Sequence, residues 1–270
     1  MYSYHNITAL VTGASKGLGA AYATELARRG ANLILVARSA AELDRRAASL
    51  TAAHGVAVHT FAADLTSADS TARLLAALDE AGLAVDLLIN NAGTGAVGPF
   101  LDRPLQPNLQ SVRLNIDALM TLTQAIGRGM VSRGAGGIVN IASTAAFQPM
   151  PYQSSYAATK AFVLSFTEAL AEELHGSGVR VMVAHPGATA TGFFDGTSAV
   201  MEPKAADSPE SVATRTLDDF ARGKTASYPG RWSTRVTTWA ARVLPRTTIA
   251  RLTGRLNRVN GFHDVVDDIA

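Results

Sequence analysis

The fold of this chain is decided by one stretch near its start, ITALVTGASKGLG, which covers residues 7–19. Residues 7–12 form an apolar, β-branched run that predicts a buried strand, and residues 17–29 have the periodicity of a helix. The glycines between them permit a tight turn and let the backbone and the helix N-terminus approach a pyrophosphate. This order of strand, turn and helix predicts a dinucleotide site. The expected cofactor-binding residues of the turn are Gly13, Ser15, Lys16, Gly17, Leu18 and Gly19.

The rest of the chain repeats this alternation of strands and helices. Short, almost wholly apolar runs predict buried strands at residues 33–37, 56–62, 85–90, 137–142 and 179–184. Helical patterns fall between them at residues 40–53, 67–81, 108–133 and 154–176. Repeated βαβ units of this kind predict an α/β protein: a single-domain Rossmann fold whose doubly wound parallel sheet has helices on both faces.

Composition excludes several classes of protein. The 270 residues are 47% hydrophobic and 17% charged, which excludes a disordered chain. The chain has no cysteine and its histidines lack HExxH-type spacing, so we expect no metal site. The net charge of +2 gives no reason to expect nucleic-acid binding. We find no signal-peptide pattern and no apolar run long enough to span a membrane, and we expect a cytoplasmic protein.

The chain shows no repeat and no low-complexity linker, so we expect one domain over residues 1–270. Residues 190–222 are expected to form a substrate loop or lid and then a helix, because Ser208 and Pro209 form a helix start signal. Residues 223–270 form a basic C-terminal extension. The loop contains the apolar residues Phe193, Phe194, Val200 and Met201. An apolar lid of this kind favours a hydrophobic substrate.

The end of the second predicted strand indicates which dinucleotide binds. In this fold an acidic residue about 20 residues after the glycine turn usually holds the ribose hydroxyl of NAD. Here the strand ends at Arg38, and the first acid after it is Glu42. Arg38 and Lys16 can both meet a 2′-phosphate, which an arginine binds through two parallel hydrogen bonds. The sequence therefore favours NADP over NAD, with two solvated cations as the alternative interpretation.

A serine, a tyrosine and a lysine are spaced in a way that indicates proton transfer. Ser143 ends the fifth predicted strand, and Tyr156 comes thirteen residues later at the start of a helix. Lys160 lies four residues further on, on the same helix face as Tyr156. A lysine ammonium beside a phenol, together with a positive nicotinamide ring, is expected to lower the pKa of the phenol towards neutral pH. Ser143 can hold the substrate oxygen that takes part in the same proton transfer.

With these motifs the chain resembles the classical short-chain dehydrogenase/reductase family over about residues 5–230. The turn Thr12-Gly13-x-x-x-Gly17-x-Gly19 is similar to the family's cofactor turn, and Asn90-Asn91-Ala92-Gly93 to its fourth-strand motif. The resemblance implies further cofactor contacts. These are Asp64, Leu65, Asn91, Ala92, Gly93, Tyr156, Lys160, Pro186, Gly187, Thr189 and Thr191.

The resemblance also implies an activity. Ser143, Tyr156 and Lys160 match the family's catalytic triad, and Asn115 matches the asparagine that holds a water in a proton relay to the lysine. The implied reaction transfers a hydride between NADP and a carbonyl or secondary alcohol of a small hydrophobic substrate, such as a ketone, a 3-oxoacyl chain or a steroid-like compound. We expect a homodimer or homotetramer. The alternative function is a cofactor-binding regulatory or scaffold protein without turnover, which the four intact catalytic residues disfavour.

The segment from Phe220 to His263 contains nine Lys or Arg and no Asp or Glu. Its apolar residues, among them Trp232 and Trp239, predict amphipathic helices. Such helices can dock on an anionic membrane. They can also bind an acidic carrier such as acyl-CoA or acyl carrier protein. The third interpretation is a solvated surface or a subunit contact.

Overall fold

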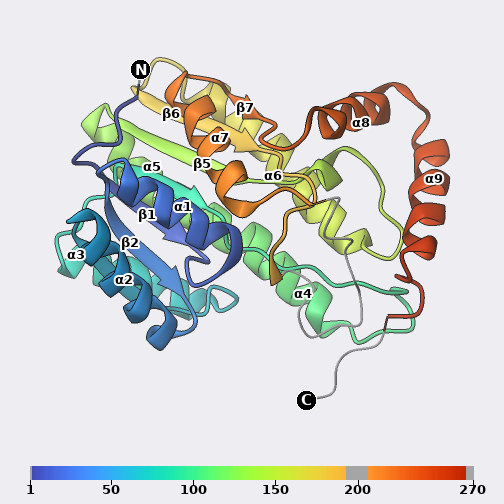
Figure 1. Cartoon of the computed structure of the whole chain (residues 1–270), viewed down its shortest axis with the longest axis horizontal. Coiled ribbons are helices and arrows are strands. Elements are labelled where there is room, and N and C mark those ends of the chain that lie inside the picture. Colours follow the sequence, from blue (N-terminus) through green and yellow to red (C-terminus); the bar gives the residue numbers. More distant parts are fainter. Residues whose placement is uncertain (1, 193–205, 266–270) are drawn as a thin grey trace.

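The computed structural model describes residues 2–192 and 206–265, and a parallel sheet forms its centre (Figure 1). The seven strands of the described chain stand in the order β3-β2-β1-β4-β5-β6-β7, and every neighbouring pair is parallel. The strands are β1 (Thr8–Thr12), β2 (Asn32–Ala37), β3 (Val58–Ala62), β4 (Leu87–Asn90), β5 (Gly136–Ile141), β6 (Val179–Ala184) and β7 (Ala226–Ser227). The strand order reverses between β1 and β4, where sheets of this kind bind ligands at their carboxyl ends.

Helices cover both faces of the sheet. One apolar cluster joins the sheet to α1, α2 and α7, and a second joins it to α3, α5 and α6 (Figure 1). The helices are α1 (Gly17–Arg28), α2 (Ala40–His54), α3 (Ala68–Glu80), α4 (Gln106–Val112), α5 (Leu119–Arg133), α6 (Ser154–Glu173), α7 (Pro209–Ala221), α8 (Trp232–Val243) and α9 (Arg246–Val259). The predicted doubly wound Rossmann fold is confirmed.

Strands β2 and β4 are almost wholly apolar because they bury both faces, whereas the edge strand β3 carries His59 and Thr60 and is only partly buried. In β2, Leu33 and Leu35 pack into the first cluster, while Ile34 and Val36 pack into the second. Side chains alternate between the two faces of a strand, so a strand covered on both sides needs an apolar residue at every position.

Two parts of the fold differ from the sequence prediction. Residues 108–133 do not form one α-helix: α4 ends at Val112, a π-helical turn covers Arg113–Ala118, and α5 follows. Single π-helical turns of this kind are frequent at functional sites. The predicted extension also begins with β7, which pairs with β6 and adds a strand to the sheet. Because β7 has only two residues, the alternation of apolar and polar residues that predicts a strand could not reveal it.

Helices α8 and α9 lie at the end of the molecule away from α2 and α3 (Figure 1). Both were expected from the spacing of apolar residues in the basic extension. The helix start at Ser208 and Pro209 is also confirmed, since the Ser208 side chain accepts a hydrogen bond from the N–H of Ser211. Within the described ranges, we find no helix with both the length and the apolar character needed to cross a bilayer.

Candidate active site

The turn between β1 and α1 brings bare backbone close to the neighbouring strand end. A Cβ atom on Gly19 would lie 2.2 Å from the carbonyl oxygen of Gly13 and 2.6 Å from Nδ2 of Asn91. Gly17 has a φ of +56°, a conformation that side-chain-bearing residues rarely adopt. Lys16 occupies the N-cap position of α1, and its side chain makes no cap hydrogen bond to the helix. The turn therefore fits a phosphate group held by the N–H groups of a helix N-terminus.

Thr12, at the end of β1, holds the segment that follows β4 in place. Its Oγ1 accepts hydrogen bonds from the N–H groups of Asn91, at 3.0 Å, and Ala92, at 2.9 Å. The Asn91 side chain donates back to the Thr12 carbonyl at 2.9 Å. Asn91 and Ala92, both expected to contact the cofactor, are thereby held beside the glycine turn. Thr12 was not among the predicted site residues, although its place at the start of the turn motif was a signal.

Cationic side chains surround the turn. Lys16 and Arg38, which were predicted to bind a 2′-phosphate, are both exposed, and Arg38 directly follows β2. Arg46 on α2 was not predicted: it donates to the Ser15 carbonyl at 3.1 Å, and its Nε is buried without a hydrogen-bond partner among the described residues. Burial lowers the pKa of the Arg46 guanidinium. A buried donor without a partner beside a glycine turn fits a bound phosphate.

Asp64 and Leu65 follow β3 and differ in orientation. Asp64 is exposed and accepts hydrogen bonds from the N–H and the hydroxyl of Thr66, at 3.0 and 2.8 Å. These bonds, and to a smaller extent the charge of Arg38, lower the pKa of the Asp64 carboxyl. Leu65 is buried and packs into the core, so only its backbone can face a cofactor.

Ser143, Tyr156 and Lys160 converge at the end of β5. Ser143 precedes a 3₁₀-helix over Thr144–Phe147, and its Oγ accepts a hydrogen bond from the N–H of Ala145 at 3.1 Å. Tyr156 lies in the first turn of α6, where its hydroxyl is hydrogen bonded to the Ser143 side chain. Lys160 Nζ lies 5.8 Å from the centroid of the Tyr156 ring and donates to the Ile141 carbonyl at 2.8 Å. The spacing read from the sequence therefore places the three side chains together.

Burial controls the titration of both Tyr156 and Lys160. It lowers the pKa of the Lys160 ammonium to about 8, because the charged form loses its hydration. It raises the pKa of the Tyr156 phenol, and the hydrogen bond with Ser143 only partly offsets this effect. The chain alone does not lower the phenol pKa, because burial penalises the phenolate, and the lowering expected beside a positive nicotinamide ring stays a prediction. A tyrosine that keeps its proton is suited to act as an acid.

Asn115 is placed by the π-helical turn and is buried. Its Nδ2 lies within hydrogen-bond distance of the Thr94 carbonyl and of Oγ1 of Thr159, both at 2.9 Å, while its Oδ1 accepts from the N–H of Thr94 at 3.0 Å. A Cβ atom on Gly93 would lie 3.2 Å from Asn115 Oδ1 and 3.3 Å from Lys160 Nζ. Gly93 therefore leaves open the space between the asparagine and the lysine.

The segment after β6 returns to the glycine turn. The Pro186 carbonyl accepts a hydrogen bond from the N–H of Thr144 at 3.0 Å, which ties Pro186 to the residue after Ser143. Thr189 donates to the Gly187 carbonyl and pairs with Asp207, so its side chain is engaged locally. Thr191 instead lies over the turn, 3.2 Å from the position of a Cβ on Gly17. Of the two predicted threonines, Thr191 is therefore the one beside the expected phosphate site.

His185, which the sequence analysis did not consider, lies buried at the end of β6. Its ring contacts the rings of Phe147 and Tyr228, with centroids 4.8 and 4.9 Å away. Burial lowers its pKa to about 4, so the imidazole is neutral near pH 7. His185 therefore acts as a neutral ring that packs against Phe147 and Tyr228 near Ser143.

A cavity of about 70 Å³ lies beside the loop that follows β4. Apolar residues of this loop, including Val97 and Phe100, line it together with Tyr152. The N–H of Gly98 donates to the Tyr152 carbonyl at 2.8 Å, which holds the loop against the segment before α6. The predicted lid residues Phe193, Phe194, Val200 and Met201 lie outside the described residues.

The chain is similar to known oxidoreductases in sequence. A family model described as short chain dehydrogenase matches residues 7–201. The very-long-chain 3-oxoacyl-CoA reductase of Bos taurus is 38% identical over 187 residues, which make up 68% of this chain and 59% of that protein. The human 17-beta-hydroxysteroid dehydrogenase type 3 is 36% identical, over 79% of this chain and 66% of that protein. The chain thus spans about three fifths of the bovine relative's length.

Solved structures give the same result. A short-chain dehydrogenase from Sphingobium yanoikuyae in complex with NADPH is 36% identical, with a TM-score of 0.78 over 87% of this chain and 94% of that chain. A bulky-bulky ketone specific alcohol dehydrogenase from Comamonas testosteroni is 32% identical, with a TM-score of 0.75 over 89% of this chain and 95% of that chain. The sheet order, the glycine turn, the Ser143, Tyr156 and Lys160 cluster and these similarities together show that the chain belongs to the short-chain dehydrogenase/reductase family.

Proposed function

We propose that the protein is an NADP(H)-dependent oxidoreductase that reduces a carbonyl group or oxidises the corresponding secondary alcohol. The observation that carries this proposal is the convergence of Ser143, Tyr156 and Lys160 beside Gly93 and the buried Asn115. These residues would hold a nicotinamide cofactor there, which would supply the hydride for the carbonyl carbon. The test is the oxidation of NADPH, followed by its absorbance, with a panel of ketones and 3-oxoacyl thioesters.

In the reductive direction each side chain has one task. The Tyr156 hydroxyl donates its proton to the carbonyl oxygen as that oxygen gains charge. Ser143, hydrogen bonded to Tyr156, holds the same oxygen. Lys160 stabilises the phenolate that remains and contacts the nicotinamide ribose. Asn115 orients a water towards Lys160 through the space that Gly93 leaves open.

The preference for NADP is supported by the cations at the glycine turn. Lys16, Arg38 and Arg46 come from three different elements, and Arg46 has a buried Nε without a partner among the described residues. A 2′-phosphate offers charged acceptor oxygens to Arg38 and to the buried Nε of Arg46. Because cells keep NADP mostly reduced, the reductive direction is the one we propose.

A bulky hydrophobic carbonyl compound is the proposed substrate class. Apolar residues, among them Val97 and Phe100, make up much of the wall of the cavity beside Tyr152, and Arg103 and Asn108 also line it. The names of the relatives point the same way, since one acts on very-long-chain 3-oxoacyl-CoA and another is specific for bulky-bulky ketones. In the substrate panel we therefore expect long or bulky ketones to have higher kcat/KM values than small ones.

Reduction is expected to slow as the pH rises through the pKa of Lys160. The ammonium predominates below about pH 8 and is lost above it, so the phenolate of Tyr156 loses its stabilising charge. We expect kcat/KM for reduction to fall about tenfold per pH unit above that value, because one proton is lost. The measurement is a pH–rate profile with NADPH. A profile that stays flat well above pH 8 would contradict the role given to Lys160.

We also propose that the chain forms a homodimer or homotetramer through α4. Leu105, Leu109 and Val112 are exposed large apolar residues at the spacing of one helix face. Sedimentation equilibrium is expected to give at least twice the chain mass of 28.2 kDa, and Leu109→Glu is expected to release monomers because it places a charge in the contact. If the wild-type protein has the mass of a single chain, this face of α4 is not a contact between subunits.

A further inference from the structure

We propose that α8 and α9 form a docking surface for a bilayer that contains anionic phospholipid. We call the outward residues of these helices the docking face. Its apolar residues are Trp232, Val236, Trp239, Val243, Leu252, Leu256 and Val259. Its basic residues are Arg251, Arg255 and Arg258, which also border a hollow beneath α9. The proposal is independent of the substrate.

The docking face is unusual in how much apolar surface it exposes. Residues 232–259 supply eight of the fifteen exposed large apolar side chains of the described chain. Trp232 is 80% exposed, Trp239 67% and Val259 84%. In α8 the apolar residues follow at intervals of four, three and four, which places them on one stripe. Clustered tryptophan and aliphatic side chains of this kind mark an interaction site.

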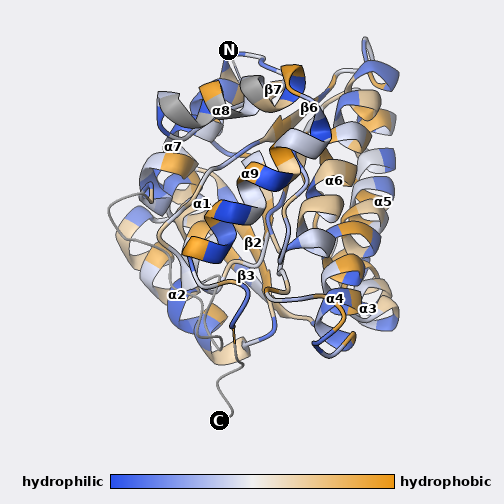
Figure 2. Ribbon diagram, turned by 90° about the vertical axis from the view of Figure 1, so that its right-hand side faces the viewer, coloured by the Kyte–Doolittle hydropathy of each residue, from blue (hydrophilic) through white to orange (hydrophobic). Residues whose placement is uncertain are grey.

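Arginine and apolar residues are paired along the sequence of both helices. The dipeptides Arg231-Trp232, Arg235-Val236 and Arg242-Val243 occur in and just before α8. In α9 the pattern returns as Arg251-Leu252, Arg255-Leu256 and Arg258-Val259. Neighbouring residues lie 100° apart around a helix, so six of the seven apolar residues of the docking face have an arginine as their sequence neighbour rather than on the opposite side, and Trp239 is the exception. Figure 2 looks onto this side of the molecule and shows hydrophilic and hydrophobic positions alternating along α9.

The inner sides of the helices are already attached to the body. Arg242 lies over the Phe147 ring at 4.6 Å, and Arg235 over the Tyr228 ring at 5.5 Å. Thr253 donates to the Pro149 carbonyl at 2.9 Å, and Asn257 donates to the Pro151 carbonyl at 2.8 Å. The arginine contacts attach α8, and the two hydrogen bonds hold α9 on the segment that connects Ser143 to Tyr156. The apolar stripe therefore faces outward because the opposite face is already packed.

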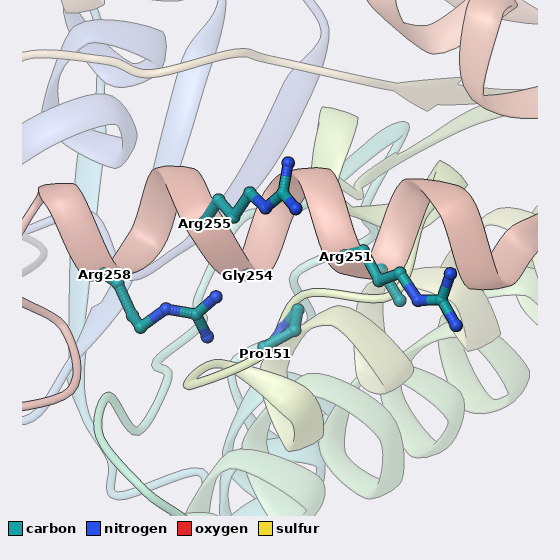
Figure 3. Close-up of a pocket in the computed structure, with 6 residues that line it drawn as sticks. Pro151, Arg251, Gly254, Arg255 and Arg258 are labelled. Carbon is teal, nitrogen blue, oxygen red and sulfur yellow. The ribbon is translucent and has the colours of Figure 1, made fainter.

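The hollow beneath α9 offers a place for a phosphate. It has a volume of about 390 Å³ and lies between α9 and Pro151, with the side chains of Arg251, Arg255 and Arg258 around it (Figure 3). Arg258 donates to the Tyr152 hydroxyl at 3.2 Å. Among the described residues no carboxylate forms a salt bridge with any of these three arginines. Guanidinium groups without acidic partners bind phosphate oxygens well.

An anionic bilayer is the occupant that satisfies both parts of this face. A second copy of the chain would cover the apolar stripe but bring equally basic segments together, since residues 220–263 carry nine cations and no acid. A bilayer interface accepts tryptophan and leucine among its acyl chains and arginine among its phosphates. On this surface the loop that joins the catalytic Ser143 and Tyr156 would lie towards the lipid.

The two tryptophans of the chain provide the test, because both lie on the docking face and no other tryptophan contributes to the emission. We expect vesicles of phosphatidylglycerol and phosphatidylcholine to shift the emission to shorter wavelength at low ionic strength, and brominated lipid to quench it. Vesicles of phosphatidylcholine alone are expected to have little effect, and added salt should reverse the binding. No shift with the anionic vesicles, or an equal shift with both kinds, would overturn the proposal.

A matched pair of double variants tests the arginines. Arg251→Gln with Arg255→Gln is expected to lower the partition coefficient on the anionic vesicles about 30-fold in co-sedimentation. Arg73→Gln with Arg128→Gln removes the same charge from exposed positions on α3 and α5 and is expected to change it less than threefold. An equal loss in both variants would mean that only net charge matters and would contradict the assigned surface.

One further result would identify a different occupant. If the tryptophan emission is already blue-shifted without lipid, and Trp232→Ser with Trp239→Ser lowers the mass in sedimentation equilibrium, the face is an interface between two copies of the chain. That result would overturn the proposal even if the oxidoreductase activity is found.

Discussion

Replacing Tyr156 with phenylalanine is expected to lower kcat for carbonyl reduction about 10³-fold, within the range of a lost general acid. The substitution removes a single oxygen and keeps the ring that Lys160 faces at 5.8 Å, so the site keeps its shape. What is lost is the proton donor and the hydrogen bond to Ser143. The measurement is single-turnover NADPH oxidation with saturating substrate.

The matched control for this experiment is Tyr152→Phe. Tyr152 lies four residues earlier, lines the cavity beside the loop after β4, and accepts a hydrogen bond from Arg258 through its hydroxyl. We expect this variant to keep kcat within a few-fold, because its hydroxyl lies outside the proton-transfer cluster. NADPH affinity is measured in both variants, so that any change in cofactor binding is separated from the loss of the proton donor. If the Tyr156 variant kept its activity, or if the Tyr152 variant lost as much, Tyr156 would not be the acid.

Arg38→Asp is expected to weaken NADPH binding about 100- to 1000-fold. The change removes a charge-assisted contact worth about 1.5–3 kcal/mol and puts a carboxylate in its place, which repels the 2′-phosphate. The acidic group of Asp64 is already nearby, since the charge of Arg38 contributes to its lowered pKa. NADH carries a ribose hydroxyl at that position, so its binding should be unchanged or stronger. Fluorescence titrations with NADPH and NADH measure both affinities.

The control for the cofactor experiment is Arg128→Asp, the same charge change at an exposed position on α5. It is expected to leave both affinities within about twofold, because at this distance salt screens the charge. Equal weakening of NADPH and NADH by Arg38→Asp would mean that Arg38 contacts a part shared by the two cofactors. A wild-type preference for NADH would reverse both the cofactor and the direction that we propose.

The elements with strong local signals were predicted correctly. The buried strands were recognised because each is apolar on both faces, as in β2. The glycine turn was recognised because Gly13, Gly17 and Gly19 stand between an apolar strand pattern and a helical pattern, and the structure leaves no room for a Cβ atom at Gly19. The pair Tyr156 and Lys160 was recognised because four residues make one helical turn, and that distance is fixed along the chain.

The features that the sequence did not reveal depend on contacts between distant segments. Arg46 lies in the second turn of α2, and no motif in the surrounding sequence indicates that it takes part in cofactor binding. Only the approach of α2 to the glycine turn brings it to the Ser15 carbonyl. The same holds for the choice between Thr189 and Thr191, which depends on how the segment after β6 crosses Gly17. The π-helical turn at Asn115 likewise interrupts a helix whose apolar pattern continues without a break.

The sequence by itself determined the order of the elements, the turn that fits a phosphate and the cluster of Ser143, Tyr156 and Lys160, because these depend on spacing within one or two elements. Asn115 was added only by the resemblance to the short-chain dehydrogenase/reductase family. Tertiary structure decided the rest. The pKa of Tyr156 rises because distant elements bury it, and the arginines of α9 border a hollow because α9 packs on Pro151. Burial and electrostatics depend on which segments meet, and local spacing does not specify that.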